Sequence, residues 1–174
     1  MKFTLTLANS LSLFRLIIAP VTVWNIISGW WLAASFLLIL AILSDLLKGP
    51  IARKKGQESS TGGLLDHSCD AFLVAVLLFV LTKTHEIPLL LPVLVILSFL
   101  QYVFDSKALT GQRLRTSFLG RSNGIAYFVL ACLCIFSEVL EINLPDYFIV
   151  NFAWILITST LLSMSERLWT LVTK

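Results

Sequence analysis

Residues 31–54 read WLAASFLLILAILSDLLKGPIARK, a mostly apolar run of 24 residues that is interrupted near its end by Asp45 and Lys48. A transmembrane helix needs about 20 consecutive, mostly apolar residues. The run is therefore long enough to cross a membrane, and it carries two charged side chains with it. Ionised groups at membrane depth are costly and usually face a cavity or a partner, so they point to a functional site.

The rest of the chain has the same character. Of its 174 residues, 57% are hydrophobic and only 13% are charged, and the mean hydropathy is +0.90. This composition excludes an ordinary soluble domain and predicts an all-α, polytopic membrane protein with one domain over residues 1–174. Six segments are expected to form the transmembrane helices: 11–27, 31–54, 62–83, 88–102, 125–140 and 147–172. The first contains Arg15 and lacks a small-residue cleavage pattern after it, so we expect it to remain in the mature protein.

The positive charges predict the orientation of these six helices. Cytoplasmic loops carry an excess of Lys and Arg. The positive residues after the second and fourth segments are Arg53, Lys54, Lys55, Lys107, Arg113, Arg115 and Arg121. The loops on the other side offer Lys83 with four acidic residues, namely Glu86, Glu138, Glu141 and Asp146. We therefore expect both termini, and the charged residues between 45 and 70, to lie toward the cytoplasm.

A cluster of charged residues is predicted where the second and third helices meet. Asp45 and Lys48 are three residues apart, and Asp66 and Asp70 are four apart, so each pair projects from one face of its helix. If the two helices face each other, three carboxylates and one ammonium converge, which is typical of a cation site. His67 is expected to point away from this face and to serve as a polar packing group.

The segment from Asp45 to Asp70 resembles the signature of the CDP-alcohol phosphatidyltransferase family, D-x2-D-G-x2-A-R-x8-G-x3-D-x3-D. Seven of the eight fixed positions match with the correct spacing, and they are Asp45, Gly49, Ala52, Arg53, Gly62, Asp66 and Asp70. Lys48 stands where the signature has its second aspartate. Two flanking stretches also resemble motifs of the phosphatidylglycerophosphate synthases in that family: Asn9, Ser12 and Arg15 in N-S-L-S-L-F-R, and G-R-S before Asn123.

The resemblance implies a reaction and a set of site residues. Such enzymes transfer a phosphatidyl group from CDP-diacylglycerol to the hydroxyl of a second substrate and release CMP. It implies that Asp70 is the general base and that Asp45, Asp66 and Asp70 hold Mg²⁺ or Mn²⁺. Divalent ions bridged by carboxylates suit a diphosphate donor, because they neutralise its charge. Gly49, Ala52, Arg53 and Gly62 would contact the nucleotide.

The resemblance also implies partners and a location. The basic residues Lys107, Arg113, Arg115 and Arg121 suit an acceptor that carries phosphate, with glycerol 3-phosphate favoured, although they equally fit the positive-inside rule. Asp105 would contact the acceptor or would be a capping or solvated charge. Membrane lipids, a bacterial inner membrane and a homodimer are expected from the family, and no nucleic-acid partner is expected.

Lys48 is the one departure from the signature, and it changes the charge balance. Four carboxylates balance two divalent cations, whereas three carboxylates and a lysine have a formal charge of −2, the complement of one. Two unit charges 4 Å apart interact by about 4 kcal/mol at an effective dielectric constant of roughly 20, and a divalent ion doubles this. At least one metal ion should therefore bind weakly, and Lys48 should form an ion pair with Asp45 or Asp66 instead.

Three functions remain open at this point. The first is a transferase of phospholipid synthesis that is impaired by Lys48, which is compatible with natural divergence and with deliberate replacement. The second is a catalytically degenerate protein that binds a CDP-linked lipid or nucleotide. An ion or proton transporter is disfavoured, because the carboxylates cluster at one interface and the chain shows no polar relay toward the other.

Overall fold

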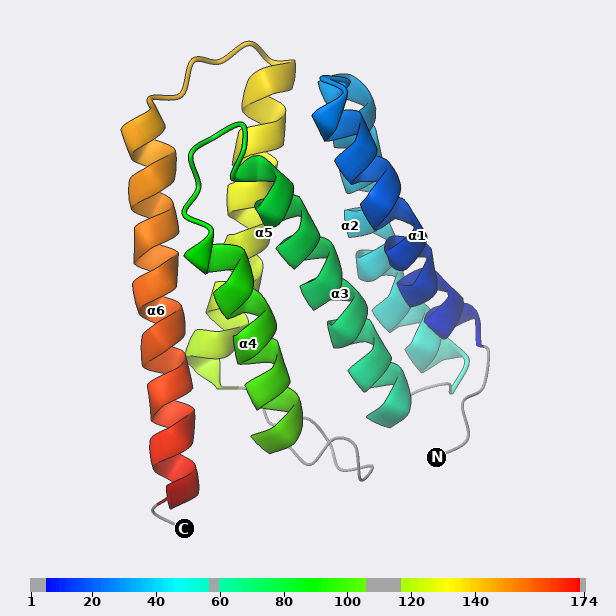
Figure 1. The fold of residues 1–174 in the computed structure, drawn as a ribbon. Coiled ribbons are helices and arrows are strands. Elements are labelled where there is room, and N and C mark those ends of the chain that lie inside the picture. The colour runs from blue at the N-terminus through cyan, green and yellow to red at the C-terminus, as the bar shows by residue number, and fades with distance from the viewer. Residues whose placement is uncertain (1–5, 57–59, 106–116, 173–174) are drawn as a thin grey trace.

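The computed structural model describes residues 6–56, 60–105 and 117–172. Within these ranges all regular secondary structure is helical, which confirms the all-α prediction. The six helices are α1 (Leu7–Ile27), α2 (Trp31–Lys54), α3 (Ser60–Leu81), α4 (Leu90–Asp105), α5 (Phe118–Val139) and α6 (Asp146–Val172). Consecutive helices run in opposite directions, so α1 begins and α6 ends at the same end of the bundle (Figure 1).

Five of the helices, α1, α2, α3, α5 and α6, are long and apolar enough to cross a membrane. The fourth is shorter: α4 has 16 residues, and it begins at Leu90 and reaches Asp105, where the sequence predicted residues 88–102. Many large apolar side chains are on the outside of the bundle, including Leu32, Phe36 and Trp169. In a lipid bilayer such a surface is favourable, because the apolar side chains contact lipid tails and not water.

The core of the bundle is centred on α3. Its residues Leu73, Leu77, Leu78 and Leu81 are at most 1% exposed. This helix packs against α1, α4 and α5, while α2 packs against α1 and α5. In the described part of the chain α2 and α3 do not pack on each other, so the two helices that carry the charged cluster are joined through α1.

The start of α5 differs from the prediction. The apolar pattern predicted a helix from residue 125, whereas α5 begins at Phe118. The reason is an N-cap: the Ser117 side chain accepts a hydrogen bond from the backbone N–H of Gly120 at 3.0 Å. Such a cap stabilises a first turn that has no apolar periodicity. The extra turns place Arg121 and Asn123 inside the helix.

Candidate active site

Three carboxylates meet at the end of the bundle where α2 ends and α3 begins. Asp45 comes from α2, Asp66 and Asp70 come from α3, and one oxygen of each lies within 4.8 Å of the others. The predicted convergence is therefore confirmed. The Asp45 side chain is 49% exposed, while those of Asp66 and Asp70 are 21% and 22% exposed. Carboxylate oxygens are the ligands that Mg²⁺ and Mn²⁺ prefer.

Arg15 of α1 lies at the centre of these carboxylates. Its side chain is 1% exposed, and its guanidinium lies 2.5 Å from Asp45 and forms an ion pair with Asp66. Its Nε is 3.2 Å from an oxygen of Asp70. A planar guanidinium with five N–H groups can contact several carboxylates at once. Arg15 thus links carboxylates of α2 and α3 from α1, which packs against both helices.

The sequence had signalled Arg15 only as part of a secondary motif. A stronger signal was present, because an arginine inside an otherwise apolar span needs a partner of opposite charge. The three aspartates of the signature were the natural candidates.

Lys48 is buried beside the same cluster, with 8% of its surface exposed. Its Nζ lies 2.7 Å from Asp66, which confirms the predicted ion pair with that residue. The ammonium also donates to the side-chain oxygen of Ser12 at 2.6 Å and to the backbone carbonyl of Gly62 at 3.2 Å. Three carboxylates and two cations leave the cluster with a net formal charge of −1.

The other signature residues occupy the last turns of α2. Gly49 and Ala52 are partly buried, and Arg53 is exposed. The Arg53 guanidinium lies over Gly49, where an added Cβ would meet its nearest nitrogen at 3.6 Å. The nucleotide contacts expected of these residues and of Gly62 stay predictions. The carbonyl of Gly62 is engaged by Lys48.

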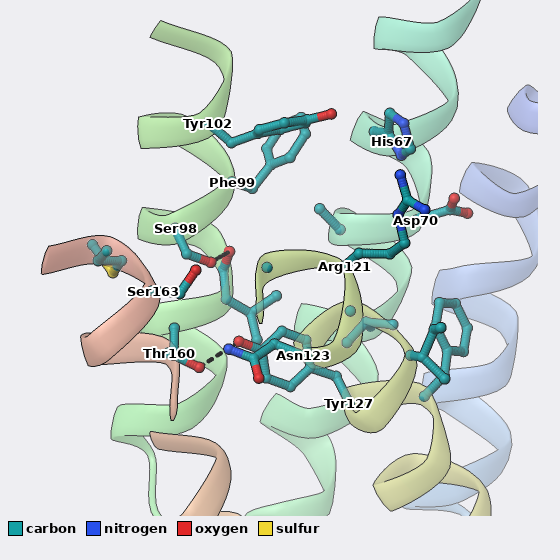
Figure 2. A pocket seen from close by; sticks show the side chains of 18 of the residues that line it. His67, Asp70, Ser98, Phe99, Tyr102, Arg121, Asn123, Tyr127, Thr160 and Ser163 are labelled. Carbon is teal, nitrogen blue, oxygen red and sulfur yellow. Dashed lines mark hydrogen bonds between the residues drawn. The ribbon is translucent and has the colours of Figure 1, made fainter. Parts of the chain in front are cut away.

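A cavity of about 440 Å³ extends from this cluster between α3, α4, α5 and α6 (Figure 2), and we call it the polar cavity for the polar side chains on its wall, although most of that wall is apolar. Asp45 and Asp70 form part of its wall. The remaining polar wall includes His67, Ser98, Tyr102, Arg121, Asn123, Thr160, Ser163 and Arg167. Asn123 is 5% exposed, and its side-chain oxygen accepts a hydrogen bond from Ser159 at 2.6 Å. The Asn123 amide nitrogen has no hydrogen-bond partner among the described residues, so it offers a donor to a polar ligand.

The position of His67 on the cavity wall differs from the prediction made from the sequence. His67 was expected to point away from the site, but it forms part of the wall that Asp70 also lines. Its ring packs edge-on against Tyr102 of α4, with 6.0 Å between centroids. The cavity continues between α3 and α4, so the face of α3 beside the carboxylates is also part of the site.

The cationic side chains of the cavity are Arg121 and Arg167. Figure 2 shows Arg121 directed toward the end of the cavity where His67 and Asp70 lie. The other basic residues expected to contact the acceptor, Lys107, Arg113 and Arg115, lie outside the described residues. Arg167 of α6 was not predicted. Its guanidinium lies over the Tyr102 ring, 4.8 Å from the centroid, and 3.8 Å from Asp105. Asp105 is therefore paired with an arginine, an arrangement that neither expectation for it included.

An apolar groove of about 510 Å³ starts at the same cluster and runs between α2 and α5. It shares Asp45, Ile125 and Phe128 with the polar cavity. Farther along α5 its wall is formed mainly by Val129, Leu133, Phe136 and Leu140. A ligand with a polar head and an apolar tail would find both surfaces within reach of Asp45.

Comparisons with known proteins agree with this geometry. The family model described as CDP-alcohol phosphatidyltransferase matches residues 5–165. The chain is 40% identical over 70 residues to the chloroplastic CDP-diacylglycerol–glycerol-3-phosphate 3-phosphatidyltransferase 1 of Oryza sativa subsp. japonica. The aligned segment covers 40% of this chain and 21% of that protein. The chain is 36% identical over 94 residues to the cardiolipin synthase (CMP-forming) of Streptomyces coelicolor, which covers 49% and 42%.

The cardiolipin synthase (CMP-forming) of Homo sapiens is 38% identical over 92 residues, which covers 52% of this chain and 31% of that protein. The chain thus matches less than half the length of each of these relatives.

Proposed function

The chain belongs to the CDP-alcohol phosphatidyltransferase family, and from this membership we propose that it moves a phosphatidyl group from CDP-diacylglycerol to a phosphorylated alcohol. The acceptor hydroxyl attacks the phosphorus of the phosphatidyl group, the bond from that phosphorus to CMP breaks, and Asp70 takes the hydroxyl proton. The observation that carries the proposal is the position of Asp70, which lies both in the carboxylate cluster and on the wall of the polar cavity. Glycerol 3-phosphate is the favoured acceptor.

The shape of the site supports a lipid donor. CDP-diacylglycerol has an anionic diphosphate at one end and two acyl chains at the other. Asp45 stands where the polar cavity meets the apolar groove between α2 and α5. The groove offers about 510 Å³ of apolar space for an acyl chain, while Gly49, Ala52 and Arg53 lie at the cytoplasmic end of α2 proposed for the nucleotide.

The polar cavity supports an acceptor that carries a phosphate. Arg121 and Arg167 place two guanidinium groups on its wall, and guanidinium groups bind phosphate through paired N–H donors. Ser98, Thr160 and Ser163 add hydroxyl groups that suit the remaining oxygens of a small polyol. These residues would hold the acceptor with its hydroxyl near Asp70.

The donor set fits one divalent cation. Asp45, Asp66 and Asp70 would hold Mg²⁺ or Mn²⁺, because their oxygens lie within 4.8 Å of one another. When bound, such an ion would neutralise the charge of the donor diphosphate. The same donor set does not fit two divalent ions, since Lys48 and Arg15 already neutralise two of the three carboxylates. We therefore propose that transfer is slower than in a site with four aspartates.

A second candidate function is binding without turnover. The buried ammonium of Lys48 favours it, because a site that has lost a metal ligand can still hold a CDP-linked lipid or nucleotide. For either function we propose the same setting, an inner bacterial membrane with the site facing the cytoplasm and the chain as a homodimer.

The deciding experiment follows CMP release from CDP-diacylglycerol during titrations with Mg²⁺ and Mn²⁺. Glycerol 3-phosphate and phosphatidylglycerol are supplied as separate acceptors. We expect slow, metal-dependent release with glycerol 3-phosphate and a rate roughly 100-fold higher in Lys48→Asp. Lys83→Asp, the same change on an exposed loop at the far end of α3, should match the wild type.

Each other outcome has a definite meaning. If no variant releases CMP but CDP-diacylglycerol still binds, the transferase proposal fails and the second candidate function, binding without turnover, is supported. Release with phosphatidylglycerol alone would keep the transferase and change its acceptor.

A further inference from the structure

We infer that the ammonium of Lys48 is a built-in counter-ion that takes the place of one metal ion, so that the site binds a single divalent cation. The inference deepens the proposed function and rests on it for the identity of the site. It concerns the number of metal ions bound, which can be measured without turnover.

The ammonium is fully satisfied by the protein. A lysine ammonium has three N–H donors, and three acceptors surround this one: Asp66 at 2.7 Å, Ser12 at 2.6 Å and the carbonyl of Gly62 at 3.2 Å. These acceptors come from α1 and α3, while Lys48 itself comes from α2. A residue tolerated by chance would leave donors unpaired or would turn toward water, whereas Lys48 is 8% exposed.

The same network occupies one oxygen of the Asp66 carboxylate. One oxygen of Asp66 accepts from the Ser12 hydroxyl at 3.0 Å and also contacts Arg15 and Lys48. A carboxylate oxygen has only about two lone pairs for such contacts. A metal ion could bind this oxygen only by displacing one of the three donors.

The charge balance also indicates that the site binds one divalent ion. With both cations in place the cluster has a formal charge of −1. If a metal ion displaced Arg15 from the carboxylates, Lys48 would still leave −2, which is the complement of one divalent ion. Lys48 would keep two of its contacts when a metal ion binds the carboxylates, because Ser12 and the carbonyl of Gly62 are not carboxylates.

The test counts bound Mn²⁺ on the purified full chain in detergent, without substrate, from the electron paramagnetic resonance signal of the free ion. We expect one Mn²⁺ per chain for the wild type and for Lys83→Asp. We expect two for Lys48→Asp, because this variant has four carboxylates. The thermal unfolding midpoint of each variant, measured with EDTA and with Mn²⁺, confirms that the counted protein is folded.

A second variant covers the case in which Lys48→Asp does not fold. Lys48→Met keeps most of the stem and removes the charge, so one Mn²⁺ should bind roughly tenfold more tightly than in the wild type. Two Mn²⁺ ions on the wild type would overturn the inference, as would an unchanged count in folded Lys48→Asp or unchanged affinity in Lys48→Met. If two ions bind and CMP is released, only the inference fails. If one ion binds and no CMP is released, only the transferase proposal fails.

Discussion

At the scale of single residues, Arg15 is the side chain that contacts all three carboxylates of the site. It is 1% exposed and lies against carboxylates from two helices that do not pack on each other in the described part of the chain. Without it, three carboxylates within 4.8 Å would repel one another. Lys48 would relieve only part of this repulsion, because it contacts Asp66 alone among the three.

We predict that Arg15→Met lowers the free energy of unfolding by about 3 kcal/mol in EDTA, because removing one partner of a buried ion pair leaves the other uncompensated. Mg²⁺ should restore much of this loss, since a divalent ion can replace the guanidinium among the carboxylates. The measurement is thermal unfolding of the detergent-purified protein with and without Mg²⁺. Arg53→Met, at an exposed position on α2, is the control and should change little. A loss that Mg²⁺ leaves untouched would contradict a shared site for the two cations.

The sequence predicted the acidic half of the site better than its basic half. Asp45, Asp66, Asp70 and Lys48 follow from helical spacing and a signature, and both are local properties of the chain. Arg167 does not, because its place beside Tyr102 depends on how α6 packs against α4. The packing role predicted for His67 is confirmed by its contact with the Tyr102 ring. Its place on the cavity wall was not predicted, because that wall is formed by helices that are distant in the sequence.

At the scale of the helices, the start of α5 shapes the polar cavity. Ser117 caps the helix, so that Gly120, Arg121 and Asn123 lie in its first two turns and face the cavity. An added Cβ at Gly120 would lie 2.9 Å from the Ser117 side-chain oxygen, so the cap and the glycine fit each other closely. Apolar periodicity could not predict these turns, because only polar residues and glycines follow Phe118 and Leu119 up to residue 124. The longer helices were predicted well, since each is a long apolar run.

We predict that Ser117→Ala costs about 1 kcal/mol of stability, the usual effect of losing an N-cap side chain. It should also raise the KM for glycerol 3-phosphate roughly fivefold, because Arg121, which lines the polar cavity, lies in the turn that frays. Thr6→Ala removes the N-cap of α1, whose side chain accepts from the N–H of Asn9 at 3.2 Å. This control should lose similar stability with the KM unchanged. An equal rise in KM for both variants would mean that stability alone controls acceptor binding.

At the scale of the whole molecule, the two ends of the bundle differ in character. One end holds the carboxylate cluster, both buried cations and the mouth of the polar cavity. The other end holds the loops between α1 and α2, α3 and α4, and α5 and α6. There His85 packs edge-on against Trp31, and one of its ring nitrogens lies 3.4 Å from Glu138. Burial lowers the pKa of His85 below its usual range. The imidazole that contacts Trp31 and Glu138 at this end is therefore harder to protonate than a free histidine.

We predict that the end with the carboxylate cluster faces the cytoplasm. In a background without Cys69, Cys132 and Cys134, Lys54→Cys should react with an impermeant thiol reagent only in inside-out bacterial membrane vesicles. Lys83→Cys should react only in right-side-out vesicles, because both positions are exposed and lie at opposite ends of the bundle. The reverse pattern would place the site outside the cell and would contradict the assignment made from the Lys and Arg residues.

The ion pair between Arg15 and Asp45 also bears on how the chain enters the membrane during synthesis. An arginine near the centre of a membrane helix raises the free energy of insertion by about 2.5 to 3.5 kcal/mol. Asp45 leaves the ribosome 30 residues after Arg15, and Asp66 leaves 51 residues after it. The first helix is therefore synthesised before any of its carboxylate partners, and the second helix supplies the first of them. This order favours insertion of α1 and α2 together as a hairpin, with the carboxylate cluster beginning to form before the third helix is made.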